Sequence, residues 1–171
     1  MNMFNNLDLI ADNIWLGNYF SSKDIEVLKK EGIEKVLTIM DDFGPVYKNN
    51  DFIHKKIEID DTETENIIQY FGECLNFMKD NKKILVHCMA GASRSATIVI
   101  AYLMWTKKMK FIDALNYTQS KRTIVDPNSG FKEQLKMFEK LLVDNNYDIE
   151  KINFKEIKKF EKYIRKMGIM K

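Results

Sequence analysis

The chain has 171 residues, 45% of them hydrophobic and 30% charged, which is enough for one domain with a proper core and too little for two ordinary ones. Its net charge of +2 and isoelectric point near 8.4 argue against a general attraction to nucleic acid, so we expect no nucleic-acid partner. Cys74 and Cys88 have neither CxxC spacing nor nearby histidine ligands, which argues against a disulfide framework and a zinc site.

The sequence also lacks the usual signals for membranes and secretion. No apolar run is long enough to cross a bilayer, and the N-terminus has neither a secretory hydrophobic segment nor a glycine at position 2. The C-terminus has no prenylation box. With two unpaired cysteines, this pattern predicts an intracellular protein, in the cytoplasm or the nucleus.

The first half of the chain alternates short apolar strands with helices. We predict a lead-in without clear period over 1–9, strands over 14–17, 36–40 and 52–59, a helix that opens at Ser22 and stops before Gly32, and a helix over 67–78. Strands that alternate with helices favour an α/β domain.

The second half continues with one more strand and then helices only. The strand covers 84–86, and helices follow from Ser95 to about Leu103, over 111–120 and over 131–142, with a connection at 121–128. The predicted fold class is therefore α/β, with a short, mostly parallel central sheet flanked by helices and an extra C-terminal helix.

The last segment, 150–171, has eight Lys or Arg and three Glu, a net charge of +5 that leaves −3 for the rest of the chain. Its apolar residues fall near helical spacing, so we predict a basic helical extension over 144–171. It could contact a membrane surface or an acidic partner weakly, or it could pack on the core with its lysines in solvent. The second interpretation is the default for such helices. The sequence makes no prediction about oligomeric state.

Residues 83–97 have an order that ordinary packing does not explain. A short apolar strand ends at Cys88, a loop of small residues with Gly91 follows, and an apolar helix begins near Ser95. In a strand, loop and helix of this kind, loop N–H groups and the unpaired first N–H groups of the helix point into one concavity that favours an anion. Five residues separate Cys88 from Arg94, so the loop can wrap a tetrahedral dianion while the guanidinium binds it with two hydrogen bonds.

The same donors act on the thiol of Cys88. A cysteine at a helix N-terminus, among N–H donors and beside Arg94, is favoured as the thiolate, which makes it a nucleophile toward phosphorus. A buried, inert cysteine is the alternative, and we interpret Cys74 in that way. If Cys88 were inert, nothing would explain why Gly91, Arg94 and Ser95 occur together after it. A protective disulfide between the two cysteines would require Cα atoms within about 7 Å.

The chain resembles the protein tyrosine phosphatase superfamily, and within it the dual-specificity phosphatases, over roughly residues 9–142. The resemblance is carried by VHCMAGASRSAT at 86–97, IAYLM at 100–104, and PNSGF at 127–131 with Gln134-Leu135 after it. It implies a small catalytic domain over 9–143 that hydrolyses phosphoproteins in two steps, without a metal or other cofactor, through a phosphocysteine intermediate.

The resemblance also implies a role for each matching residue. Cys88 would be the nucleophile, and Ser95 would donate a hydrogen bond to the departing thiolate. Asp61 matches the general acid, nine residues before the aromatic pair Tyr70-Phe71, with Asp60 as the adjacent alternative. His87 and Asn128 would hold the loop in place. The phosphate would be bound by Met89, Ala90, Gly91, Ala92, Ser93 and Arg94.

Differences between this sequence and related phosphatases narrow the class of substrate. The loop brings no lysine, which weakens a phosphoinositide substrate, and the chain is too short for the insertions that deepen the pocket of tyrosine-specific domains. A shallower pocket would accept phosphoserine and phosphothreonine beside phosphotyrosine. Two alternatives stay open: a phospho-binding scaffold with negligible turnover, and a phosphoinositide or RNA 5′-phosphatase.

Overall fold

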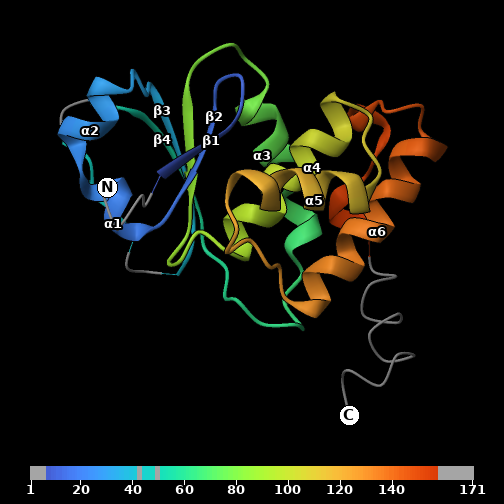
Figure 1. The fold of residues 1–171 in the computed structure, drawn as a ribbon. Helices are drawn as coiled ribbons and strands as arrows, with labels where there is room; N and C mark the ends of the chain where they lie inside the picture. The colour runs from blue at the N-terminus through green and yellow to red at the C-terminus, as the bar shows by residue number, and fades with distance from the viewer. Residues whose placement is uncertain (1–6, 42–43, 49–50, 158–171) are drawn as a thin grey trace.

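A five-stranded sheet lies at the centre of the structure, a computed structural model that describes residues 7–41, 44–48 and 51–157 (Figure 1). The strand order is β1-β2-β5-β3-β4, in which β1 is antiparallel to β2 and the other neighbouring pairs are parallel. The predicted α/β class with a short, mostly parallel sheet is therefore confirmed. The strands are β1 (Leu7–Ala11), β2 (Ile14–Gly17), β3 (Lys35–Ile39), β4 (Ile53–Ile57) and β5 (Ile84–His87).

Helices cover both faces of this sheet. Figure 1 shows α1 and α2 on one side of the sheet and α3 to α6 on the other. Because successive strand residues point to opposite faces, Leu37 and Val86 enter the core beneath α3 to α6, whereas Val36 and Leu85 pack against Leu28 of α2. The α-helices are α1 (Tyr19–Lys23), α2 (Ile25–Lys30), α3 (Phe71–Met78), α4 (Arg94–Thr106), α5 (Phe111–Lys121) and α6 (Ser129–Asp144), and the 3-10 turns are η1 (Ile67–Tyr70), η2 (Ile149–Lys151) and η3 (Phe154–Glu156).

The helix α4 is the centre of the larger layer. It contacts α3, α5, α6 and β5, and its residues 98–101 are fully buried, as a helix without a polar face requires. Since β2, β3 and β5 run parallel, their carboxyl ends meet at one edge of the sheet. The loop from β5 into α4 lies at that edge, which is where open α/β sheets bind ligands.

Two early elements differ from the prediction. The end of the predicted lead-in, 1–9, belongs to strand β1, which sits at the sheet edge. Leu7 and Ile10 are buried and Leu9 is exposed, so its apolar residues do not alternate with polar ones and gave no clear period. The predicted helix from Ser22 is two helices, because Asp24 leaves the helical conformation and caps α2, accepting a hydrogen bond from the Val27 N–H (3.1 Å).

In its described part, 145–157, the segment after α6 is not the predicted helix. Over the described part of 150–171 the chain forms short 3-10 turns, and residues 158–171, with the proposed membrane or acidic-partner contact, lie outside the described residues. Ile152 and Phe154 are buried in the main core, so the packed unit extends beyond residue 143. Among the helices that the structure describes, none is long and apolar enough to cross a bilayer.

The core contribution of this segment can be tested with Phe154→Ala. The ring packs against Phe138, with centroids 6.0 Å apart, and over Gly72 of α3, where a side chain would collide with it. We expect the free energy of unfolding, measured in urea, to fall by about 3 kcal/mol. Val46→Ala is the exposed control, expected to stay within about 0.5 kcal/mol of the wild type. An equally small effect of Phe154→Ala would show that the segment adds nothing to the core.

Candidate active site

The thiol of Cys88 lies at the centre of the loop between β5 and α4. Its side chain is 1% exposed, and its Sγ accepts hydrogen bonds from the Gly91 N–H (3.2 Å) and the Ser95 hydroxyl (3.1 Å). Both donors stabilise negative charge on sulfur more than they stabilise a neutral thiol. The structure thus brings Cys88, the loop and Ser95 together as the sequence predicts.

The carbonyl groups of this loop are held on its outer side. Arg122, at the end of α5, donates to the carbonyls of Ala90 (3.1 Å) and Gly91 (2.9 Å), and the Asp126 N–H donates to that of Ala92 (2.9 Å). In a trans peptide the N–H points opposite to the C=O. Carbonyls fixed outward therefore direct the following N–H groups inward, toward the place where an anion would sit.

Sequence reasoning missed Arg122. Its guanidinium is buried and forms an ion pair with Asp8 of β1 (2.6 Å), a residue 114 positions earlier in the chain. Its neighbours Thr123 and Ile124 are exposed, so hydrophobic periodicity carries no signal for this position. Its importance follows only from the three-dimensional contact with the loop.

Gly91 cannot be replaced without moving the loop. Its φ of +70° lies in the left-handed region, and an added Cβ would lie 2.7 Å from the carbonyl carbon of Gly17, at the end of β2. The side chain of Met89, by contrast, is exposed at the rim, and its carbonyl accepts a hydrogen bond from the Tyr19 N–H (3.1 Å). The loop therefore packs directly on the ends of its neighbours.

Arg94 is fixed at one end and unpaired at another. Its Nη1 donates to the Ile59 carbonyl (3.0 Å), while its buried Nε has no hydrogen-bond partner among the residues that the structure describes. The nearest carboxylate oxygen, Oδ2 of Asp61, is 3.9 Å away, which is too far for a hydrogen bond. An unpaired buried donor is costly, so its place where the Cys88 loop enters α4 suits a group that binds an anionic ligand.

The structure separates the two candidate acids. Asp61 faces the loop, where its Oδ1 accepts hydrogen bonds from the Ser93 hydroxyl (2.7 Å) and the Asn128 side-chain amide (2.8 Å). Asn128 also caps α6, since its Oδ1 accepts the Phe131 N–H (2.9 Å). Ser93 and Asn128, expected to bind phosphate and to support the loop, therefore both hold Asp61.

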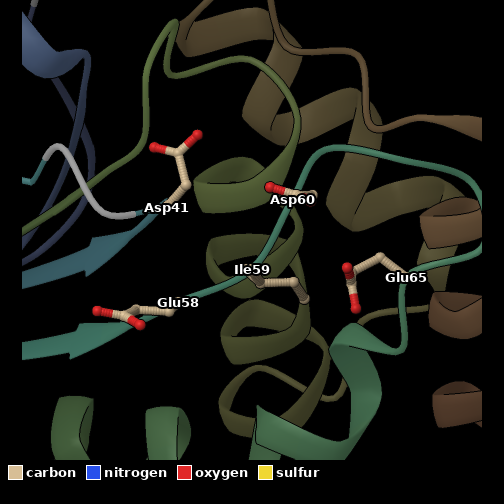
Figure 2. A pocket seen from close by; sticks show the side chains of 5 residues that line it. All are labelled: Asp41, Glu58, Ile59, Asp60 and Glu65. Atoms are coloured by element: carbon tan, nitrogen blue, oxygen red, sulfur yellow. The ribbon is translucent and has the colours of Figure 1, made fainter.

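Asp60 instead lines a separate pocket of about 220 Å³, which Figure 2 shows. Four of its five lining residues carry a carboxylate: Asp41, Glu58, Asp60 and Glu65, beside Ile59. So much negative charge would repel a phosphate dianion. The pocket is therefore distinct from the loop around Cys88, and of the two aspartates it is Asp61 that bonds to that loop, through the Ser93 hydroxyl.

His87 supports the strand before the thiol. Its Nε2 hydrogen-bonds to the Thr38 hydroxyl (2.7 Å), which also bonds to His54 Nε2 (2.8 Å), and its Nδ1 lies 3.4 Å from the Cys88 carbonyl. Burial lowers the pKa of His87 to about 4. A neutral imidazole therefore ties β5 to β3 directly beside the loop.

Cys74 lies in the core on α3 and is fully buried, and both cysteines are free thiols. Burial raises the pKa of the Cys74 thiol far above its ordinary value, so it stays protonated and inert. The two cysteines therefore differ in their surroundings: Cys74 lies in the apolar core, whereas the Cys88 Sγ accepts two hydrogen bonds.

The neutrality of His87 has a consequence for stability. Because its pKa falls from 6.5 to about 4 on folding, the unfolded chain takes up a proton in this range that the folded chain does not. The free energy of unfolding should therefore drop as the pH falls, by about 2 kcal/mol from this residue between pH 7 and pH 5. Urea unfolding of wild type and His87→Gln at both pH values measures this, since the groups away from His87 titrate equally in the two proteins. An equal pH dependence in both would contradict the assignment.

Comparisons with known proteins agree with this geometry. The family described as dual specificity phosphatase, catalytic domain, matches residues 14–141. Dual specificity protein phosphatase 1 of Arabidopsis thaliana is 38% identical over 136 residues, which cover 77% of this chain and 68% of that protein. Protein-tyrosine-phosphatase MKP1 of the same plant is 37% identical over 130 residues, 74% of this chain but only 17% of that longer protein.

A solved structure is similar in the same way. The crystal structure of human tyrosine phosphatase-like serine/threonine/tyrosine-interacting protein is 35% identical, has a TM-score of 0.76, and is matched over 80% of this chain and 97% of its own. With the fold, the thiol loop and the family match in agreement, the chain belongs to the dual-specificity phosphatase family.

Proposed function

We propose that this protein hydrolyses phosphate monoesters on phosphotyrosine and on phosphoserine or phosphothreonine of protein substrates, with Cys88 as the nucleophile. The observation that carries the proposal is that four groups lie at one loop: the Cys88 thiol, the Ser95 hydroxyl, the Arg94 guanidinium and the Asp61 carboxylate. The thiol accepts hydrogen bonds from the Gly91 N–H and the Ser95 hydroxyl. The guanidinium Nε is unpaired among the described residues, and two donors hold the carboxylate.

In the first step, the Cys88 thiolate attacks phosphorus, so that an Sγ–P bond forms and the P–O bond to the leaving oxygen breaks. The inward N–H groups and Arg94 hold the other phosphate oxygens. The leaving oxygen needs a proton, which Asp61 supplies. Because Oδ1 of Asp61 already accepts two hydrogen bonds, Oδ2 is the oxygen that carries the proton.

In the second step, water attacks the phosphocysteine and Asp61 takes the proton that the water loses. The Sγ–P bond breaks with its electron pair on sulfur, and inorganic phosphate leaves. The Ser95 hydroxyl, 3.1 Å from Sγ, donates to the sulfur as its charge returns.

The dual substrate class is supported by the relatives named as dual specificity phosphatases and by a loop without lysine between Cys88 and Arg94. The second candidate function is a phospho-binding scaffold, which is favoured by the structural relative that is named as an interacting protein. The presence of nucleophile, arginine, hydroxyl and acid in one site supports the enzyme.

Cys88→Ser separates these two functions. We expect it to abolish hydrolysis of 4-nitrophenyl phosphate and of phosphopeptides, because serine at this position is a far weaker nucleophile than a thiolate. Binding of tungstate, a phosphate analogue, should persist, since the loop N–H groups and Arg94 remain. Cys74→Ser is the matched control and should retain turnover. Equal, near-zero rates in wild type and Cys88→Ser would support the scaffold.

The role of Asp61 predicts a dependence on the leaving group. Asp61→Ala should lower turnover on the order of 10² to 10³-fold for phenyl phosphate, whose leaving group needs a proton, and much less for 4-nitrophenyl phosphate. Steady-state kinetics over a series of aryl phosphates measures this dependence as a leaving-group slope, the change in the logarithm of turnover with the pKa of the leaving group. Asp60→Ala, which removes the neighbouring carboxylate from the acidic pocket, should leave the slope unchanged. The reverse result would move the acid role to Asp60.

A further inference from the structure

The segment that carries Asp61 has little regular structure of its own. Residues 58–66 contain no helix or strand, and the Glu65 N–H bonds locally to the Thr62 carbonyl (3.2 Å). A carboxylate on such a segment needs support from outside it to stay aligned with Cys88. Besides the Ser93 hydroxyl, this support comes from the Asn128 cap and the first two turns of α6.

Three successive points of this segment rest on α6. At the first, the Asn128 side chain donates to Asp61 (2.8 Å). At the last, Gln134 donates through Nε2 to the Glu65 carbonyl (2.8 Å) and accepts through Oε1 from the Ile68 N–H (3.0 Å). Gln134 is fully buried, and its second amide hydrogen faces the Gly130 carbonyl at 3.2 Å, so the network fixes the orientation of the amide.

Between them lies a contact that only glycine permits. A Cβ built on Gly130 would lie 2.6 Å from the carbonyl carbon of Glu63 and 2.8 Å from its Cα, and still closer to the carbonyl oxygen. These are backbone atoms, so a side chain at 130 must displace the segment itself rather than a flexible neighbour. Glu63 is two residues from Asp61, so the displacement would reach the carboxylate.

We propose that Gly130 and Gln134 are positioning residues for Asp61. The absence of a side chain at Gly130 and the hydrogen bonds of the Gln134 amide hold the segment 58–66, which carries Asp61, against α6. The proposal rests on Asp61 as the acid of the proposed function. Neither residue touches the phosphate or the thiol. Both act through the placement of the Asp61 carboxylate, where an error of about 1 Å can cost on the order of a hundredfold in rate.

Gly130→Ala tests the contact between Gly130 and the Glu63 backbone. We expect turnover of phenyl phosphate to fall on the order of a hundredfold, while that of 4-nitrophenyl phosphate changes by about threefold or less, so that the variant reproduces the leaving-group slope of Asp61→Ala. Alanine favours the helix more than glycine does, so a loss of helix is not the expected cause. Gly72→Ala is the matched control: it also adds a Cβ to a crowded helical glycine, but against the Phe154 ring, and should keep the wild-type slope.

The double variant separates positioning from general damage. In the Asp61→Ala background, Gly130→Ala should cause little further loss, because the acid that it misplaces is already absent. Gln134→Met, which keeps the volume and removes the amide, should shift the slope in the same direction by a smaller factor, and it covers the case in which Gly130→Ala does not fold.

Two results would overturn the proposal, and they differ. If Asp61→Ala steepens the leaving-group slope but Gly130→Ala and Gln134→Met do not, Asp61 is the acid but Gly130 and Gln134 do not position it. If Asp61→Ala itself leaves the slope unchanged, Asp61 is not the acid and the positioning role fails with it. Equal losses on both substrates, in both backgrounds, would also overturn it, because that pattern is structural damage.

Discussion

The outward anchoring of three loop carbonyls is the interaction on which the rest of the site depends. Arg122 holds the carbonyls of Ala90 and Gly91, and the Asp126 N–H holds that of Ala92, so the peptide N–H groups that follow point inward. The buried ion pair with Asp8 keeps the guanidinium in place. An anion-binding loop is thereby set before any ligand arrives, which is the condition for electrostatic stabilisation without reorganisation during the reaction.

The carboxylate of Asp61, the proposed acid, is held in a different way. It belongs to a segment without regular structure, and neutral donors on the loop and at the start of α6 hold it, while the Arg94 Nε is 3.9 Å away, beyond hydrogen-bond distance. Both halves of the site therefore depend on elements from the end of the chain: α5 and the following connection hold the loop, and α6 holds the acid. This explains why the PNSGF block at 127–131 accompanies the cysteine block although no residue in it bonds to the thiol.

Local patterns predicted most of the fold, and long-range contacts account for what they missed. The apolar run before Cys88 and the helix after it could be predicted because their burial follows from their own composition. The edge strand β1 could not, since only Leu7 and Ile10 of its five residues are buried. In the site, spacing alone predicted Cys88 and Arg94. Burial of Arg122 and the bare contact at Gly130 depend on partners far away in the chain, so no local pattern carries them.

The central claim is that Cys88 attacks phosphorus and carries the phosphoryl group between two steps. The most direct measurement is a rapid acid quench during turnover of 4-nitrophenyl phosphate, followed by mass spectrometry of the peptides that contain each cysteine. The account predicts one phosphoryl group on the Cys88 peptide, formed as fast as 4-nitrophenol is released, and none on the Cys74 peptide. Steady turnover with no adduct on Cys88, or with the adduct on another residue, would contradict it.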